Sequence, residues 1–406
     1  MFQDSKKRKQ LMYSYAVFIL NGMLALSIGA IMPFIRDERN LSYALCGTLV
    51  SLHSVGNLIS SFFAGALAVK LGRKRSILLF DACFALAYAL ILFGHSPAFL
   101  ILAFTMTGLA RGATSNFCNA VVNGLAPGKA ALINGLHAMF SLGAFAFPIF
   151  LMFLTRRNPS NWSYACAFML IMGVLSWVLY WMIPVEDERV ERKSGETGTQ
   201  NTFGFVREPI FYLTIVTLFF YLCAEQGVIG WLVTYFKDTG LLSASNAQLM
   251  ASVQWIMILV GRLTNAWLST RVKKERILPV MGIGLVAFFL LLINSTSAGL
   301  IMIGIMGFGF SMAGIYPTTV SFSGKLIQDY PLAWSFILTL ASFGSILMPS
   351  VIGKIAENAG IAAGMSSVGA VVVVDLICIL FLTGYLTKKE RSENGNKEKP
   401  DLESKQ

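Results

Sequence analysis

The segment GALAVKLGRKR, residues 65–75, is a short basic turn between two long apolar stretches of the chain. The segment AWLSTRVKKER, residues 266–276, repeats this arrangement 201 positions later, again with basic residues between two apolar stretches. Two copies at one offset indicate a duplicated unit. The apolar stretches on either side of each turn therefore decide the fold.

The composition is that of a membrane protein. Of the 406 residues, 55% are apolar and only 13% are charged, and the mean hydropathy is +0.66. A soluble globular protein has about 25% charged residues, so this chain has too little polar surface to cover a folded body in water. These values argue against a soluble enzyme, a disordered chain and a nucleic-acid-binding protein. They predict an integral membrane protein.

A membrane-spanning helix needs about 20 mostly apolar residues, and the chain holds two sets of six such segments. The first set lies near residues 13–35, 42–68, 77–95, 98–125, 129–155 and 163–184. The second set lies near residues 209–236, 242–269, 277–296, 298–323, 330–353 and 362–386. We expect an all-α membrane protein with two six-helix bundles, residues 13–184 and 209–386. The remaining segments are a cytoplasmic N-terminal tail (1–12), a cytoplasmic linker (185–208) and a disordered cytoplasmic tail (387–406).

The net charge of +11 has its explanation in orientation. Most Lys and Arg residues lie in segments on the same side as the N-terminus, such as 6–9, 70–75 and 271–276. Because basic residues accumulate on the cytoplasmic side, both termini are expected to be cytoplasmic. The six cysteines lie inside apolar stretches without a C-x-x-C pair, which favours buried thiols over metal ligands or disulfides.

Residues 65–74 resemble the loop signature of the major facilitator superfamily, G-x-x-x-D-[RK]-x-G-[RK]-[RK]. Val69 stands where the family has Asp, and the second copy departs further. The resemblance implies two parallel six-helix repeats around an axis along the membrane normal, with a cavity that opens to each side in turn. It also implies a gating loop formed by the residues that match the signature, Gly65, Lys70, Gly72, Arg73 and Lys74.

Within the superfamily the chain is similar to the fucose permease group of sugar–cation symporters. The fifth span has that group's spacing of Asn, His, Phe, Gly and Pro, met by Asn134, His137, Phe140, Gly143 and Pro148. The seventh span reads YLCAEQGVIGWLVTY from Tyr221, and the tenth contains Tyr316-Pro317-Thr318. The resemblance implies sugar transport and location in a bacterial inner membrane. The group's coupling carboxylates on helices one and four align with Gly29 and Ser115, and neither position is acidic here.

Five ionisable residues fall inside apolar spans, where each costs at least about 2.5 kcal/mol unless it faces a cavity or a partner. The resemblance places Arg111 and Glu225 on cavity-lining helices, at similar depth in opposite halves. We expect them to interact, directly or through the solute, in a contact that breaks as the halves rock. The alternative is that each pairs within its own half. Arg262 is interpreted as a structural, snorkelling residue, and Asp81 and Asp375 as members of structural ion pairs.

Glu225 is the only carboxylate that these arguments place on a cavity helix. A carboxylate in a cavity can exchange a proton or bind Na⁺, so Glu225 is the predicted coupling residue, with Arg111 as its counterpart. Symport with H⁺, symport with Na⁺ and uniport all stay open.

Polar residues follow one face of the fourth span. Arg111, Ser115 and Asn119 recur at every fourth position, Asn116 widens the stripe, and Asn21 on the first span adds to it. Hydroxyls and amides suit a sugar, although they also serve as contacts between membrane helices. Arg111 also permits an anionic solute. Further candidate contacts, for which packing is the alternative, are Asn134, His137, Tyr221, Trp231 and Tyr316.

The predicted function is a secondary transporter that imports a sugar or a related polar solute, neutral or anionic. Import is expected to proceed by alternating access, in symport with H⁺ or Na⁺. No phosphate-binding loop, metal-ligand set or nucleophile triad is present, so we expect no enzyme activity, cofactor or metal. The expected partners are a small-molecule solute and the lipid bilayer, without nucleic acid, and the expected state is a monomer. One alternative is an exporter of drugs or amphipathic compounds, for which 31 Phe and 18 Met could form the pocket. Another is a membrane receptor that transports nothing.

Overall fold

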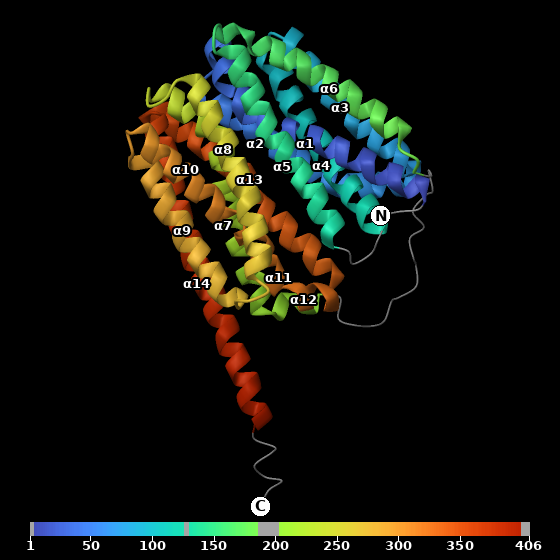
Figure 1. Cartoon of the computed structure of the whole chain (residues 1–406), viewed down its shortest axis with the longest axis vertical. Coiled ribbons are helices and arrows are strands. Elements are labelled where there is room, and N and C mark those ends of the chain that lie inside the picture. Colours follow the sequence, from blue (N-terminus) through green and yellow to red (C-terminus); the bar gives the residue numbers. More distant parts are fainter. Residues whose placement is uncertain (1–3, 126–129, 186–202, 399–406) are drawn as a thin grey trace, which may run out of the picture.

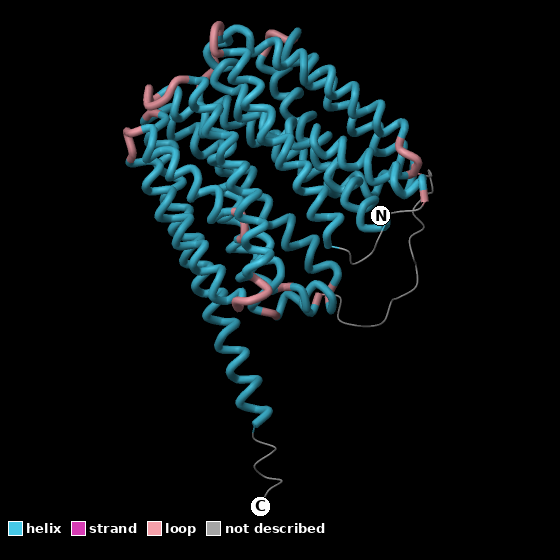
Figure 2. Tube along the Cα trace, in the orientation of Figure 1, coloured by secondary structure: helices cyan, strands magenta, loops and turns pink. Residues whose placement is uncertain are grey.

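The computed structural model describes residues 4–125, 130–185 and 203–398. Within these residues, twelve helical segments are long and apolar enough to cross a membrane. The described chain consists of helices joined by short loops (Figures 1 and 2). The N-terminal half contains α1 (Ser5–Arg39), α2 (Tyr43–Leu71), α3 (Arg73–Phe93), α4 (Pro97–Leu125), α5 (Ala130–Thr155), the 3₁₀ turn η1 (Pro159–Asn161) and α6 (Trp162–Met182).

The C-terminal half begins with the 3₁₀ turn η2 (Gly204–Arg207) and α7 (Pro209–Asp238). It continues with α8 (Ala244–Leu268), α9 (Lys274–Asn294), α10 (Ala298–Met312), α11 (Ile315–Phe322), α12 (Gly324–Asp329), α13 (Pro331–Ala359) and α14 (Ile361–Glu398). These bounds confirm the predicted all-α membrane fold of six spans plus six. Most predicted ends lie within a few residues of the helix ends, although residue 129 and most of the predicted linker (186–202) lie outside the described residues.

The two halves lie side by side, each a bundle of its own (Figure 1). We call the side on which α1 begins and α14 ends the terminal side, and the side on which α1 and α7 end the distal side. Helix α1 packs mainly on α5 and α4, and α7 packs mainly on α13 and α14. Each of these helices thus makes most of its contacts within its own half.

Equivalent residues of the repeat start equivalent helices. The hydroxyl of Ser42 accepts a hydrogen bond from the backbone N–H of Leu45 at the start of α2. Ser243, 201 positions later, caps α8 in the same way by accepting from the N–H of Asn246. A capping hydroxyl satisfies one of the N–H groups that have no partner at a helix start. The duplicated caps place the second helix of each half in the same register.

The tenth span differs from its expected form as one helix. It is broken into α10 and α11 between Met312 and Ile315. Pro317 contributes to the break, because it has no N–H to donate to the carbonyl of Ala313. The next residue, Thr318, donates its N–H to the carbonyl of Gly314, which restores the helical pattern. The break lies beside Tyr316.

The C-terminal tail corrects a second expectation. We expected disorder from residue 387, whereas α14 continues to Glu398. A helix that is already formed extends at little cost, since nucleation is the unfavourable step. Lys273 in the turn before α9 also pairs with Glu390 at 2.7 Å, which ties the extension to the bundle. Residues 399–406 lie outside the described part of the chain.

Contacts between the halves follow the internal repeat. Helix α2 packs against α13, α8 packs against α5 in the equivalent arrangement, and α1 packs against α7. The Ser51 hydroxyl on α2 bonds to that of Ser350 on α13 at 2.8 Å. Its equivalent, Ser252 on α8, donates to the carbonyl of Phe145 on α5 at 2.9 Å. The halves are therefore related by a pseudo-two-fold axis, as parallel repeats require.

Crossed ion pairs join the halves across this axis on the distal side. Arg36 and Asp37 lie in the last turn of α1, and the equivalent Lys237 and Asp238 lie in the last turn of α7. Arg36 pairs with Asp238 at 2.9 Å, and Lys237 pairs with Asp37. The hydroxyl of Tyr43 also donates to Asp238 at 2.9 Å. Each acid–base dipeptide thus binds its own counterpart in the other half.

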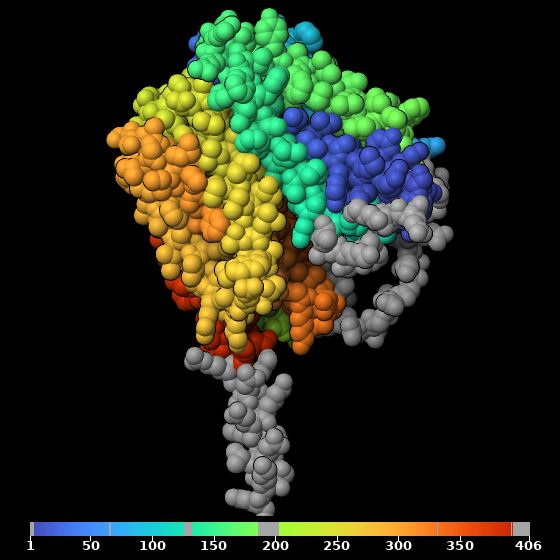
Figure 3. Space-filling model, viewed as in Figure 1, coloured from blue at the N-terminus to red at the C-terminus, as the bar shows by residue number. Residues whose placement is uncertain are grey.

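The halves meet on the distal side and separate toward the terminal side. The hydrogen bonds and ion pairs described above that join the two halves all lie in the distal half of the helices that make them. In the space-filling view the N-terminal half, coloured blue to green, contacts the C-terminal half at the top, and a hollow lies between them below (Figure 3). The structure is closed on the distal side and open toward the side that carries the termini.

Candidate functional site: a polar cavity between the halves

A cavity of about 320 Å³ lies between the two halves, within the range of small-molecule sites. It is lined by the middle of α2 and α4 on one side and by α7, α11 and α13 on the other. Most of its lining is polar. The lining residues are Ser54, Asn57, Leu58, Ser61, Phe62, Arg111, Asn116, Leu222, Glu225, Gln226, Tyr316, Ser335, Leu338, Thr339, Ser342 and Ser345.

Arg111 is held on the N-terminal wall of this cavity. Its Nη1 lies 3.3 Å from Nε2 of His53 on α2. The guanidinium carbon also lies 6.0 Å from the centre of the Phe140 ring on α5, at the limit of a cation–π contact. These two contacts occupy one edge and one face of the guanidinium. The remaining donors are available to a solute, because Arg111 is itself a lining residue.

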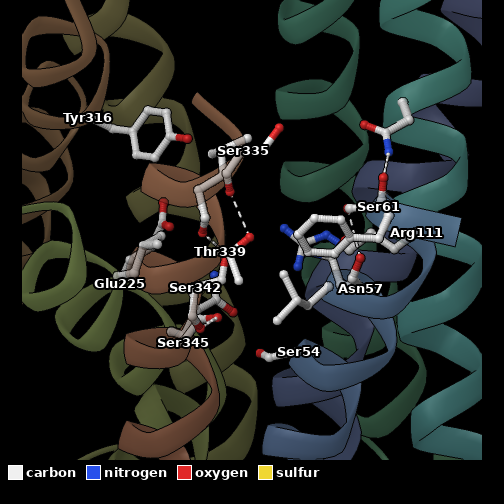
Figure 4. Close-up of a pocket in the computed structure, with 16 residues that line it drawn as sticks. Ser54, Asn57, Ser61, Arg111, Glu225, Tyr316, Ser335, Thr339, Ser342 and Ser345 are labelled. Carbon is white, nitrogen blue, oxygen red and sulfur yellow. Dashed lines mark hydrogen bonds between the residues drawn. The ribbon is translucent and has the colours of Figure 1, made fainter. Parts of the chain in front are cut away.

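Glu225 lies on the opposite wall, contributed by α7 (Figure 4). The hydroxyl of Tyr221, one helical turn earlier, donates to its Oε1 at 3.1 Å. The ring of Tyr221 is in turn 6.0 Å from that of Tyr316, centre to centre. The carboxylate therefore has a fixed orientation toward the cavity and one neutral hydrogen-bond donor.

The predicted relation between Arg111 and Glu225 is refined by this geometry. The two side chains lie on opposite walls of one cavity and are close enough to interact electrostatically. No ion pair joins them among the described residues, and the nearest hydrogen-bonding partner of each belongs to its own half. The space between them can hold a solute that contacts both.

The stripe on α4 divides between the cavity and helix packing. Asn116 lines the cavity and donates to the carbonyl of Ser61 at 2.9 Å. Asn21 on α1 is 2% exposed and donates to the hydroxyl of Ser115 at 3.1 Å. Asn119 donates to the carbonyl of Ser115 on its own helix at 2.8 Å. Of the four polar residues beside Arg111, only Asn116 thus lines the cavity in this state, and the other three act in contacts between or within helices.

The other predicted contacts are also divided. Tyr316 lines the cavity. Tyr221 does not line it, but its hydroxyl donates to the lining residue Glu225. Trp231 is fully buried near the distal side and donates its indole N–H to the carbonyl of Pro349 at 3.1 Å. His137 on α5 contacts the Phe18 ring edge-on, and Asn134 is exposed near the start of α5. Neither belongs to the residues that line the cavity.

The sequence interpretation missed the hydroxyl-rich wall of α13. Ser335, Thr339, Ser342 and Ser345 recur at three- and four-residue spacing and all line the cavity (Figure 4). On α2, Ser54, Asn57 and Ser61 do the same from the facing wall. The signal was present as a polar stripe at helical period on otherwise apolar spans.

The remaining charged residues of the spans have different partners from those expected. Asp81 is 1% exposed and accepts hydrogen bonds from Ser176 at 3.0 Å and Thr114 at 3.5 Å, so hydroxyls replace the expected ion pair. Asp375 is fully buried, and neither of its oxygens has a partner among the described residues. Arg262 is half-buried and within electrostatic reach of His137 and Tyr221, so it faces the centre of the protein.

The proposed gating loop is the turn between α2 and α3. Gly65 and Lys70 belong to the last turns of α2, and Arg73 and Lys74 begin α3. Gly72 between them has φ +92°, a conformation that side chains disfavour. Lys74 reaches the carbonyl of Ile183 at the end of α6 at 3.3 Å. The turn thus connects three helices of the N-terminal half on the terminal side.

The family model of the Major Facilitator Superfamily matches residues 14–325 and 242–405. The chain belongs to the major facilitator superfamily. This confirms the resemblance found in the loop signature, and it identifies the protein as a multi-pass membrane transporter. The match does not separate the groups of the superfamily, so the likeness to the fucose permease group stays a prediction.

Individual relatives agree with this assignment. Protein TsgA of Escherichia coli O6:K15:H31 is 25% identical over 397 residues, which cover 95% of this chain and 97% of TsgA. Among solved structures, a point mutant of the nucleoside transporter NupG superimposes with a TM-score of 0.77 at 14% identity, covering 93% of this chain and all of that one. A bacterial homologue of the human lysosomal transporter Spinster, in an inward-facing and occupied conformation, superimposes with a TM-score of 0.75 at 13% identity, covering 94% of this chain and 98% of that one. At these identities the two structures show the shared fold.

Proposed function

We propose that this transporter carries a sugar or a related polar solute, neutral or anionic, through the cavity between its halves. The observation that carries the proposal is the placement of Arg111 and Glu225 on facing walls of a cavity lined mainly by hydroxyl and amide groups. Such groups both donate and accept hydrogen bonds, as the hydroxyls of a sugar do. A carboxylate or phosphate on the solute would bind the planar fork of Arg111.

Glu225 is the proposed coupling group. Its carboxylate faces the cavity with Tyr221 as its hydrogen-bond donor and Arg111 across the space. Binding of H⁺ or Na⁺ neutralises it, and solute binding to Arg111 changes the field that it senses. Coupling then follows, because solute and cation each favour the state in which the other is bound.

Transport requires the opposite conformation, in which the distal contacts open. The pairs α2–α13 and α5–α8 are equivalent under the pseudo-two-fold axis, so rocking of the halves would break both together. We assign the terminal side to the cytoplasmic face of the membrane, because basic residues concentrate there. The proposed membrane is a bacterial inner membrane. With import as the direction, the present state is the one that releases solute inward.

The alternative of an exporter for amphipathic compounds is less well supported by the lining. Large apolar side chains in the cavity come from four residues, Leu58, Phe62, Leu222 and Leu338. A binding site for drug-like compounds is lined predominantly by apolar and aromatic groups. Polar residues outnumber apolar ones in the lining of this cavity.

Uptake into proteoliposomes tests the proposal. Proton and sodium gradients are imposed separately with labelled L-fucose, D-glucose, D-glucuronate and uridine, and with ethidium as an amphipathic probe. We expect one of the polar solutes to accumulate under one of the two gradients. Glu225→Gln should abolish gradient-driven accumulation and keep exchange of solute at equilibrium. The control Glu390→Gln, an exposed carboxylate outside the cavity, should behave as wild type. Movement of ethidium alone, or full accumulation by Glu225→Gln, would overturn the proposal.

A further inference from the structure

His53 is buried beside the cavity without lining it. Its side chain on α2 is 2% exposed, and the residues that enclose the cavity begin at its neighbour Ser54. Helices α2 and α4 approach very closely here, since a Cβ built on Gly108 would lie 1.9 Å from the carbonyl oxygen of His53. This approach places the imidazole between Thr107 and Arg111 of α4.

The hydrogen bonds around the imidazole determine which nitrogen carries the proton. Arg111 has donors and no acceptor, so Nε2 of His53, 3.3 Å from Nη1, must accept. In a neutral imidazole the proton is then on Nδ1, which lies 2.8 Å from the hydroxyl oxygen of Thr107. That hydroxyl donates its own hydrogen bond to the carbonyl of Phe104, at 2.6 Å. Every proton in the series therefore has one acceptor.

We propose that His53 is a positioning residue that holds the guanidinium of Arg111 at the cavity wall, through a directed chain of hydrogen bonds from Arg111 to His53, Thr107 and the carbonyl of Phe104. The chain starts at a charged side chain and ends on the backbone of α4. It fixes one edge of the guanidinium and so directs the remaining N–H groups. A protonated or reversed imidazole would present a donor to Arg111 and release it.

The assignment of Arg111 as a solute contact rests on the proposed function, whereas the hydrogen-bond chain does not. Two kinds of measurement separate them. Nitrogen NMR of the imidazole reports the chain without any solute. The concentration dependence of uptake reports whether the position of Arg111 affects solute binding.

The first measurement uses protein with ¹⁵N-labelled histidine in lipid bilayers near neutral pH. The chain has three histidines, and the signals of His53 are identified by their loss in His53→Gln. We expect a protonated Nδ1 and a bare Nε2. Arg111→Met should allow the Nε2–H form to appear, because the donor that excludes it is gone. Thr107→Val removes the oxygen that accepts from Nδ1–H and should shift the Nδ1 signal, whereas the matched control Thr107→Ser keeps the hydroxyl and the wild-type spectrum.

The outcome of this experiment is decisive by itself. A protonated Nε2 in the wild-type protein would overturn the proposal. An Arg111→Met spectrum identical to that of the wild type would overturn it as well, because Nε2 of His53 would then not accept a hydrogen bond from Arg111. The first comparison needs only the wild-type spectrum once His53 is assigned, and loss of the other two sets of signals in His95→Gln and His137→Gln assigns it where His53→Gln fails to fold.

The second measurement compares His53→Gln with His53→Asn in uptake of the solute that the wild type accumulates. The longer Gln can place its amide oxygen near the position of Nε2, whereas Asn falls short. A hydrogen bond to a charged group accounts for about a tenfold change in affinity. We expect KM to rise about tenfold in His53→Asn and to stay close to the wild-type value in His53→Gln, with kcat little changed in both. Equal KM values for wild type and Asn, with the NMR result as expected, would leave the chain intact and refute Arg111 as a solute contact.

Discussion

At the scale of single residues, the cavity brings together charges that are costly in a bilayer. Arg111 and Glu225 lie on separate walls, and each is satisfied by a neutral neighbour, His53 or Tyr221. A fully paired Arg–Glu contact would have left neither group for a solute. The spacing of the two walls thus keeps both charges available, as the proposed coupling through Glu225 requires.

Arg111→Lys tests whether the planar fork matters as well as the charge. Lysine keeps the positive charge but binds as a point charge and cannot make two parallel bonds to a carboxylate. We expect KM for an anionic solute such as D-glucuronate to rise about tenfold, and KM for a neutral sugar to change less. Initial rates of uptake at varied concentration measure both. As a control, Arg271→Lys changes an arginine that stacks on Trp267 at the surface. Equal KM values for Arg111→Lys and wild type would contradict the proposed role.

Sequence patterns identified part of this site and missed the rest for a physical reason. Charges inside apolar spans have few permitted environments, so Arg111 and Glu225 could be found from sequence. Hydroxyls on membrane helices bond to their own backbone, as Thr339 does to the carbonyl of Ser335 at 2.6 Å and Ser342 to that of Leu338 at 2.7 Å. Such residues cost little in lipid, so their presence on a span says little about which way they face.

At the scale of helices, the length of each apolar stretch predicts where the spans lie, but it does not predict where a helix is broken or extended. Hydropathy located all twelve spans because a helix must cover the bilayer with apolar residues. The break beside Tyr316 depends on Pro317 together with neighbours that accept the distortion, and the extension of α14 depends on a contact with Lys273. Both need tertiary information that a single sequence lacks.

Close approach of α2 and α4 is the element-scale feature that places His53 beside Arg111. We expect Gly108→Ala to destabilise the protein by about 2 kcal/mol, since its methyl group would overlap the carbonyl oxygen of His53 and overpacking of this kind costs ~1–3 kcal/mol. Gly124→Ala on the same helix is the matched control, because a Cβ there meets nothing within 4 Å. Thermal unfolding in detergent compares the two. The apparent Tm should fall by several degrees in Gly108→Ala and stay at or above wild type in Gly124→Ala. A wild-type Tm in both variants would show that the helices can separate without cost.

At the scale of the whole molecule, the duplication that was visible in two basic turns also appears in the contacts that close one side. Ser51 and Ser252 each bond across the halves, and Arg36-Asp37 and Lys237-Asp238 bind one another crosswise. A duplicated unit that dimerises with its own copy produces such reciprocal contacts, because each residue meets the counterpart of its partner. The offset of the repeat could be found from sequence, whereas the conformational state in which these residues meet could not.

Breaking the crossed ion pairs should favour the state that is open on the distal side. Asp238 has only 7% of its side chain exposed and receives Arg36 and Tyr43, and removal of one partner from a buried pair is costly. We expect Arg36→Ala to shift the balance of states by about 1–2 kcal/mol, a factor of roughly 5–30, toward the distal-open state. The exchange Arg36→Asp with Asp238→Arg should restore much of the closed population, since it reverses the pair without removing it.

Electron–electron distance measurements between spin labels report this balance. Arg157 and Thr296 are exposed on the distal side of opposite halves and carry the labels, in a background in which the six native cysteines are replaced. The distance distribution should lengthen in Arg36→Ala and return toward wild type in the exchanged pair. As a control, Lys273→Ala removes an exposed ion pair on the terminal side and should leave the distribution unchanged. If Arg36→Ala and wild type give the same distribution, packing of α2 on α13 and α5 on α8 closes the distal side alone, and the crossed pairs contribute nothing to the conformational equilibrium.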